Sequence, residues 1–206
     1  MTAPAPNRTA KRRQRTRQQL LKATEQVVLQ HGYEEASAES IAELADLGRS
    51  TFYNHFGNKW DVVLATLIDR YREYGEKAYV PLETTHDRAQ SVVRSTVSVF
   101  KDVVNDPLTR QLVDRPLLLA RAIAESQGEF VARDFSEGIA QQRFKITVSE
   151  ASLLSSLNWS NVGLIIHAIS QDSVDETCLD WARLLLMQLG IKQDEIEKVI
   201  HSAVQD

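Results

Sequence analysis

Apolar residues recur along this chain at the three- and four-residue spacing that places them on one face of an α-helix. The first such face belongs to a helix expected from about Gln14, and it comprises Leu20, Ala23, Thr24, Val27 and Val28. Gly32 follows as the expected C-terminal cap. No segment alternates apolar and polar residues for long enough to predict a β-strand. The pattern therefore predicts an all-α protein.

Two short helical segments come next, and their spacing is informative. Ser37 is the expected N-cap of the first, which ends near Asp46. The second runs from Thr51 to about Phe56, because Phe52 and Phe56 are four residues apart and can share a buried face. A longer helix followed by two short ones across a glycine-containing turn is the arrangement of a helix-turn-helix. An ordinary three-helix bundle is the alternative that spacing alone leaves open.

Longer amphipathic helices account for the rest of the chain. Lys59 opens one whose apolar stripe extends to Pro81. Beyond it, the periodicity predicts helices over residues 87–104, 108–113, 117–126, 129–144, 150–169, 174–189 and 193–204.

The helices expected at 150–169 and 174–189 carry more apolar surface than one intramolecular face needs. A four-helix bundle shared by two copies of the chain would bury this surplus, which predicts a homodimer. A buried helix pair inside a monomer is the alternative. The interface residues expected for the dimer are Leu154, Asn158, Val162, Ile165, Trp181 and Leu185.

Charge separates the two ends of the chain. Residues 1–60 hold nine Lys and Arg against six Asp and Glu, whereas residues 61–206 hold 15 against 22. The first 22 residues carry seven basic groups and no acidic one. This asymmetry indicates a small part that faces a polyanion, attached to an acidic body.

Several other classes of protein lack support in the residues. Cys178 is the single cysteine, which excludes an intramolecular disulfide and favours a buried apolar role in a reducing cytoplasm. No apolar run resembles a signal peptide or reaches the length of a membrane span. We find no nucleophile elbow, P-loop, dinucleotide fingerprint or paired metal ligands, and therefore expect no enzyme, catalytic residue, metal or cofactor. A helical adaptor that binds protein, or a ligand-binding protein without DNA, remains the alternative.

Residues 20–63, LLKATEQVVLQHGYEEASAESIAELADLGRSTFYNHFGNKWDVV, resemble the DNA-binding domain of the tetracycline-repressor (TetR) family of transcriptional regulators. The positions that carry the resemblance are Gly32-Tyr33, Ser37, Ile41-Ala42, the run from Thr51 to Phe56, and Lys59. Three positions depart from the family pattern: Asp46 stands in place of the turn glycine, Gly48 in place of the capping serine, and Trp60 in place of an acidic residue. Asp46 can still adopt the left-handed conformation that the turn requires.

The resemblance implies three domains and a DNA-binding function. We expect a disordered basic arm over residues 1–13 that follows the DNA backbone or enters the minor groove, and a helix-turn-helix domain over 14–58. An effector-binding and dimerisation domain is expected over 59–206. Lys11, Arg12, Arg13, Arg15 and Arg17 supply cations for phosphates, and Ser37 either binds a phosphate or only caps its helix. The resemblance assigns Tyr53, His55 and Lys59 to phosphates and groove walls. Arg49, Ser50, Thr51 and Asn54 are the candidates for contacts with base edges.

The family further implies a repressor that binds an inverted-repeat double-stranded DNA operator as a dimer and is released by a small-molecule effector. The expected pocket residues are Tyr71, Tyr74, Phe100, Leu118, Ile123, Phe130, Phe135, Trp159 and His167. For each of them, packing in the core is the alternative. The expected partners are therefore operator DNA, an unidentified effector and a second copy of the chain, with no membrane.

Overall fold

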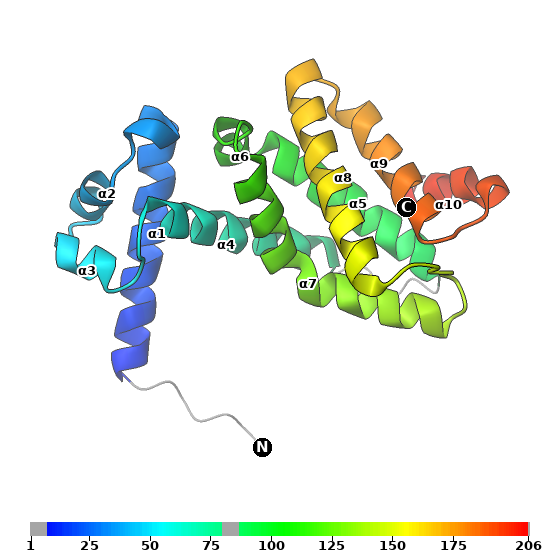
Figure 1. Ribbon diagram of the computed structural model, residues 1–206, viewed down its shortest axis with the longest axis horizontal. Helices are drawn as coiled ribbons and strands as arrows, with labels where there is room; N and C mark the ends of the chain where they lie inside the picture. Colours follow the sequence, from blue (N-terminus) through cyan, green and yellow to red (C-terminus); the bar gives the residue numbers. More distant parts are fainter. Residues whose placement is uncertain (1–7, 80–86, 206) are drawn as a thin grey trace. The chain divides into compact units, whose positions relative to one another are not determined.

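The computed structural model of the chain describes residues 8–79 and 87–205, and every regular element within these ranges is an α-helix (Figure 1). The predicted all-α class is therefore confirmed. The chain forms two compact units, Met1–Leu67 and Ile68–Asp206, and the division falls inside helix α4. The sequence predicted the domain boundary earlier, at the start of that helix, because the Gly57-Asn58 turn is recognisable from its residues. A division inside a continuous helix has no such sequence signal.

The first unit contains α1 (Arg8–Glu35), α2 (Ala38–Leu44), α3 (Arg49–Tyr53) and the first half of α4 (Lys59–Tyr79). Gly32 interrupts α1 with φ 79°, as the predicted cap requires. The start of α1 corrects the prediction of a disordered arm, because residues 8–13 are already helical. This segment is rich in Ala, Lys and Arg, which have high helix propensity and extend the helix from its buried C-terminal part. The arm predicted for residues 1–7 lies outside the described residues.

The turn between α2 and α3 has the geometry expected for a helix-turn-helix. Ser37 caps α2 in a reciprocal capping box with Ser40, in which each side chain accepts from the other's backbone N–H at 3.0 Å. Asp46 adopts a left-handed φ of 54°, and Gly48 is the N-cap of α3 without a side-chain hydrogen bond. The recognition helix begins and ends earlier than predicted, at Arg49 and Tyr53, because the glycine cap allows helical geometry directly after it.

Phe52 and Phe56 are both buried, with ring centroids 6.1 Å apart, so their predicted role in the core is confirmed. They seat the short helix α3 in the first unit, since five residues form too little helix to be stable alone.

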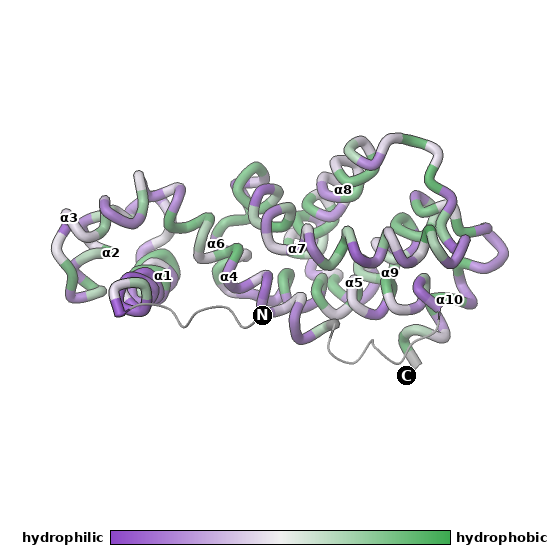
Figure 2. The backbone as a smooth tube through the Cα atoms, turned by 90° about the horizontal axis from the view of Figure 1, so that it is seen from below, coloured by the Kyte–Doolittle hydropathy of each residue, from purple (hydrophilic) through white to green (hydrophobic). Residues whose placement is uncertain are grey.

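The second unit contains the remaining half of α4 and six further helices. Their bounds are α5 Arg88–Asn105, α6 Pro107–Gln111, α7 Pro116–Ala140, α8 Glu150–Gln171, α9 Val174–Gln188 and α10 Gln193–Gln205. Helix α5 packs against α7, α8, α9 and α10 and forms the centre of the unit. Hydrophobic and hydrophilic positions alternate along α5, α7 and α9, as expected for amphipathic helices (Figure 2).

Helix α7 corrects the prediction of two separate helices over 117–126 and 129–144. It is continuous through Gly128, which lies at an exposed position with open space around it. A single glycine costs a helix only about 1 kcal/mol, and the packing of a long helix overrides this cost. The end of α7 comes before Phe144, whose ring folds back onto Gly138.

A buried carboxylate joins α4 to α6 within the second unit. Asp106 caps α6 by accepting from the backbone N–H groups of Leu108 and Thr109 at 2.7 and 3.1 Å. Its other oxygen accepts from Arg70 Nε at 2.5 Å and from the Tyr74 hydroxyl at 2.6 Å. Every lone pair that burial removes from water therefore has a donor nearby.

Cys178 is buried on α9, and burial raises the pKa of its thiol. The predicted apolar role of this residue is therefore confirmed. Within the described ranges, no helix combines the length and the apolar character needed to cross a membrane.

Candidate functional site

The short helix α3 turns one side toward the core of the first unit and the other toward solvent. Phe52 is fully buried, whereas Arg49, Ser50, Tyr53 and Asn54 are exposed. Thr51 and His55 are half-buried on its flanks. The polar residues predicted to face DNA are thus brought together on one accessible surface, which we call the α3 face.

Arg49 on the α3 face already has a partner. Its Nε lies 2.8 Å from Glu39 Oε1, and its guanidinium lies 5.6 Å from the centroid of the Tyr53 ring. This pair was not predictable from the sequence, because the turn separates the two residues. Both side chains are largely exposed, so the ion pair is weak and can exchange for another partner.

Lys59 has a structural role that the sequence reasoning missed. Its ammonium group donates to the backbone carbonyls of Tyr33 at 2.7 Å and Glu34 at 3.0 Å. It also lies 4.4 Å from the centroid of the Tyr33 ring. Two of its three donors therefore hold the C-terminal end of α1, where cations are favoured, and only the third is available to a phosphate.

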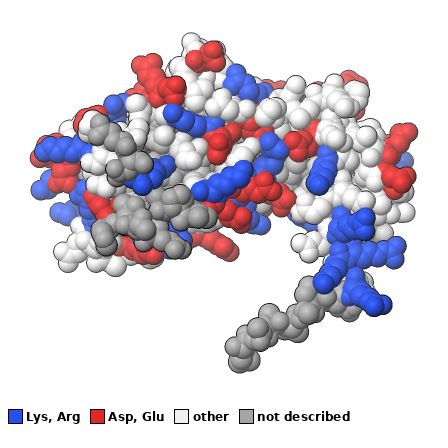
Figure 3. Space-filling view, turned by 180° about the vertical axis from the view of Figure 1, so that it is seen from behind, with Lys and Arg blue, Asp and Glu red and all other residues white. Residues whose placement is uncertain are grey.

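Lys and Arg side chains gather over the N-terminal part of α1 (Figure 3). Arg15 is exposed there, whereas the Arg17 guanidinium packs 5.7 Å from the centroid of the Phe56 ring. Burial lowers the pKa of the nearby His55, and repulsion from Arg13 and Arg17 lowers it further. Both effects favour the neutral form of this imidazole in the free protein.

Ser37 uses its hydroxyl in the capping box with Ser40, and the two hydroxyl oxygens lie 3.1 Å apart. Capping thus explains the serine in full. The backbone N–H groups at the start of α2 are the part of this site that remains suited to a phosphate.

The second unit contains a cavity of about 320 Å³ between α5, α7, α8 and α9. Its wall is mostly apolar and includes the rings of Phe100, Phe135 and Trp181. The amide side chains of Gln127, Asn158 and Asn161 also line it. A mainly apolar pocket of this size with a few polar groups fits a small organic ligand.

Three of the nine predicted pocket residues, Phe100, Ile123 and Phe135, line this cavity. The other six do not line it. Tyr71 and Tyr74 are held by Thr109 and Asp106, Leu118 is fully buried in the core, and Phe130 borders Gly75 on α4. Trp159 and His167 are exposed on α8. Periodicity identifies apolar faces, but it does not distinguish a packed face from one beside a cavity.

The predicted interface residues also need correction. Val162 and Ile165 are buried within the chain, while Leu154, Asn158, Trp181 and Leu185 line the cavity. The large apolar side chains that α8 and α9 leave exposed away from the cavity are Trp159, Leu184 and Met187. When a helix is apolar on several sides, its sequence does not show which side faces its own core.

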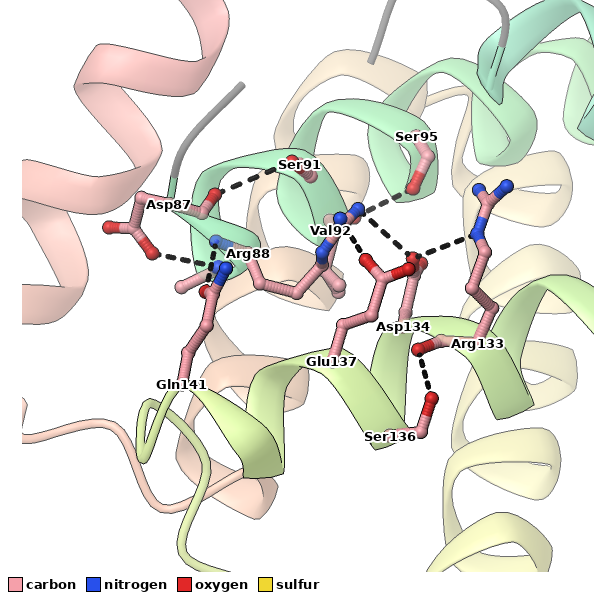
Figure 4. A network of polar contacts seen from close by, with 11 residues as sticks. Asp87, Arg88, Ser91, Val92, Ser95, Arg133, Asp134, Ser136, Glu137 and Gln141 are labelled. Atoms are coloured by element: carbon pink, nitrogen blue, oxygen red, sulfur yellow. Dashed lines mark hydrogen bonds and ion pairs between the residues drawn. The ribbon is translucent and has the colours of Figure 1, made fainter. Parts of the chain in front are cut away.

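An ion-pair network joins α5 to α7 beside the cavity (Figure 4). Arg88 on α5 reaches two carboxylates of α7, with 3.5 Å between its Nη1 and Asp134 Oδ1 and a closer contact to Glu137. Arg133 approaches Asp134 at 4.0 Å from the same helix. Among the described residues that line the cavity, Asp134 is also the only charged one.

Comparisons with known proteins agree with this geometry. Residues 20–66 match the family model described as bacterial regulatory proteins of the tetR family. The transcriptional regulator TtgR of Pseudomonas putida is 30% identical over 106 residues, which are 51% of this chain and 50% of that protein. The transcriptional activator FasR of Mycolicibacterium smegmatis is 32% identical over 92 residues, which are 45% of this chain and 42% of that protein. The matches thus span about half the length of these curated relatives.

The fold extends the similarity beyond the first unit. The crystal structure of RolR in complex with resorcinol has a TM-score of 0.74, with 21% identity over 96% of this chain and 97% of that one. At that identity the comparison shows a shared fold and leaves the ligand open. Residues 20–66 of the first unit thus match the tetR family of bacterial regulatory proteins, and the chain as a whole shares the fold of RolR.

Proposed function

We propose that the protein is a DNA-binding transcriptional regulator whose operator affinity is controlled by a small molecule in the second unit. The observation that carries this proposal is the α3 face: an exposed polar surface on a short helix that two buried phenylalanines hold in place. Such a helix can enter the major groove, where Asn54 pairs with an adenine and Arg49 leaves Glu39 for a guanine. The basic part of α1, with Arg15 exposed, then neutralises phosphates.

A homodimer is part of this proposal, because two recognition helices about 34 Å apart match one turn of an inverted-repeat operator. The exposed apolar face of α8 and α9 supports it. Leu184 and Met187 are three residues apart on α9, and Trp159 is exposed on α8 with Gly163 one turn further along. A second copy of the same face would cover these side chains in a symmetric contact.

Coupling between the cavity and the DNA would run through α4. Gln127 lines the cavity, and its amide donates to the backbone carbonyl of Tyr71 on α4 at 2.7 Å. Gly75, one turn further along α4, permits this approach, because an added Cβ there would lie 2.8 Å from the Gln127 amide oxygen. A ligand that moves Gln127 can thus change the preferred position of α4, provided that it binds the two states with different affinity.

The named relatives include both a regulator and an activator, and the proposal favours repression with release by the effector. A cytoplasmic location and the absence of an enzymatic reaction belong to the same proposal. A protein-binding adaptor would use the apolar face of α8 and α9 but would leave the α3 face without a role.

The proposal is tested by selecting DNA from a random double-stranded library with the full-length protein. We expect an inverted repeat to be enriched and its affinity to fall steeply with salt, since phosphate contacts release counterions. Affinity that is equal for every sequence, or independent of salt, would reject a specific regulator in favour of the adaptor.

A further inference from the structure

Three polar side chains of the cavity wall donate hydrogen bonds to other parts of the protein. The Asn158 amide nitrogen donates to the Ala120 carbonyl at 3.0 Å. This hydrogen bond fixes the orientation of the amide, so that Oδ1 is on the side away from Ala120. The Gln127 amide donates to Tyr71, as described above. The Ser95 hydroxyl donates to the Val92 carbonyl at 3.2 Å. One amide N–H of Asn158, the Gln127 amide and the Ser95 hydroxyl are therefore already engaged within the protein.

Two amide oxygens on α8 have no donor to accept from among the described residues. Oδ1 of Asn158 and Oδ1 of Asn161 are shielded from solvent and have no hydrogen-bond partner in the part of the chain that the structure describes. The two residues are three apart, so they lie on one face of α8, and both line the cavity. Buried acceptors of this kind are costly unless a donor reaches them, and a bound ligand can supply that donor.

Charge narrows the class of ligand. None of the cavity-lining residues that the structure describes is a Lys or Arg, and Asp134 is acidic, so a carboxylate or phosphate on the ligand would meet no compensating cation from them. The rest of the wall is apolar, and Phe100, Phe135 and Trp181 offer ring faces and edges. The volume of about 320 Å³ lies at the lower end of the range for small-molecule sites.

We propose that the cavity binds an uncharged aromatic molecule of phenol type, whose hydroxyl donates its one proton to the amide oxygen of Asn161, with Asn158 on the same face of α8, while its ring packs among Phe100, Phe135 and Trp181. The Asn161 amide can turn about its last torsion at little cost to reach the hydroxyl, since that torsion is broad. The identification of this molecule as the effector rests on the proposed function, but the binding site itself does not.

Isothermal titration calorimetry on the full-length protein, without DNA, tests the ligand class with a matched series of probes. The probes are para-propylphenol, its methyl ether, para-propylbenzoate and phenethylammonium. We expect the phenol to bind about tenfold more tightly than the methyl ether, which keeps the ring but has lost the donor. We expect no binding of the benzoate. Equal affinity for phenol and ether, tighter binding of either ion, or binding of none of the four would overturn the inference.

Substitution of the two asparagines tests the site. Asn161→Leu removes an acceptor without a partner, so the free protein should keep its melting temperature or gain, while the affinity for the phenol falls about tenfold. Asn158→Leu also removes the hydrogen bond to Ala120 and should lower the melting temperature. Asn105→Leu, at the exposed end of α5, is the surface control and should change neither quantity. An Asn161→Leu protein that binds the phenol as well as the wild type would contradict the assignment.

Operator binding is measured separately, with and without the phenol. Phenol binding in a protein that binds no DNA would sink the proposed function and leave the site intact. Specific DNA binding in a protein that binds no phenol would reject the phenol site and leave the proposed DNA-binding function intact.

Discussion

The two units of this protein use polar residues in opposite ways. In the first unit, polar side chains on α3 are exposed, while Phe52 and Phe56 occupy the core. In the second unit, polar side chains such as Asp106, Asp134 and Asn158 are buried or partly buried among apolar helices. An exposed polar group is hydrated, so it costs little free energy when it has no protein partner. A buried polar group must form hydrogen bonds with the protein or with a ligand.

This difference separates stability from recognition. On the α3 face, a substitution should change DNA binding with little effect on folding. In the second unit, the same kind of substitution should affect folding, unless the group lacks a hydrogen-bond partner in the described part of the chain, as the amide oxygen of Asn161 does. The predictions below test this contrast, beginning with the largest expected effect.

Asp106→Ala should lower the free energy of unfolding by about 3–5 kcal/mol, because it breaks the ion pair between Arg70 and a buried carboxylate and removes the cap of α6. Urea denaturation measures this loss. The control is Asp102→Ala on the exposed side of α5, which should stay within about 0.5 kcal/mol of the wild type. A small effect at Asp106 would show that buried polar groups matter less here than the contrast requires.

Lys59→Ala should cost about 1.5–3 kcal/mol of stability, since its ammonium group holds two backbone carbonyls of α1. DNA affinity should fall for all sequences alike. Arg15→Ala, on the exposed side of α1, should instead leave stability unchanged and reduce the salt dependence of DNA binding by about one ion. Thermal denaturation together with salt titrations distinguishes the two variants. If Lys59→Ala and Arg15→Ala had equal melting temperatures, the structural role of Lys59 would be contradicted.

Asn54→Ala should reduce discrimination at one operator position by about 1–3 kcal/mol without changing the melting temperature. Tyr53→Ala, its neighbour on the exposed side, should weaken all sites together. Competition gel shifts with single-base operator variants provide the measurement. If Asn54→Ala lowered affinity equally for every variant, the residue would be a phosphate contact rather than a base contact.

Gln127→Leu should reduce the coupling between ligand and operator by about 1 kcal/mol, because the hydrogen bond to Tyr71 on α4 is lost. Operator affinity is measured with and without the phenol, using Gln111→Leu on the exposed surface of α6 as the control. Coupling that persists unchanged in Gln127→Leu would exclude this route.

His55 should give the smallest effect, visible as a pH dependence of stability. Its pKa is lowered in the folded protein, so its contribution is fully present above the unfolded pKa of about 6.5 and is lost as the pH falls toward the folded pKa. The stability of the wild type relative to His55→Gln should therefore decline between about pH 8 and pH 5.5. Urea denaturation at both values measures this change; a relative gain at the acidic value would contradict the assigned sign.

The same contrast explains how far the sequence could predict the structure. The first unit depends on local signals: Ser37 as a cap, Asp46 in a left-handed turn, and Phe52 four residues before Phe56. These signals act over a few residues, so the helix-turn-helix and the exposed polar side of α3 were predictable. The exception is Lys59, whose carbonyl partners lie 25 and 26 residues earlier.

The second unit depends on contacts between distant residues, and the sequence predictions were weaker there. Its helices were found from their periodicity, apart from the false break at Gly128 in α7. The inward and outward sides of α8 and α9 were not, because both helices are apolar on several sides. Val162 and Ile165 were therefore predicted to be interface residues. Asn161 was not predicted as a site residue, because the lack of a hydrogen-bond partner for its amide oxygen is visible only in the structure.

Operator binding by the variant Tyr53→Ala/Asn54→Ala tests the central claim most directly, namely that the exposed side of α3 reads DNA. Fluorescence anisotropy would compare this variant with the wild type on the operator obtained by selection, with circular dichroism to compare their folding. We expect an unchanged helical spectrum and melting temperature, with specific affinity reduced to the level of random DNA. A folded variant that still binds the operator as tightly as the wild type would contradict it.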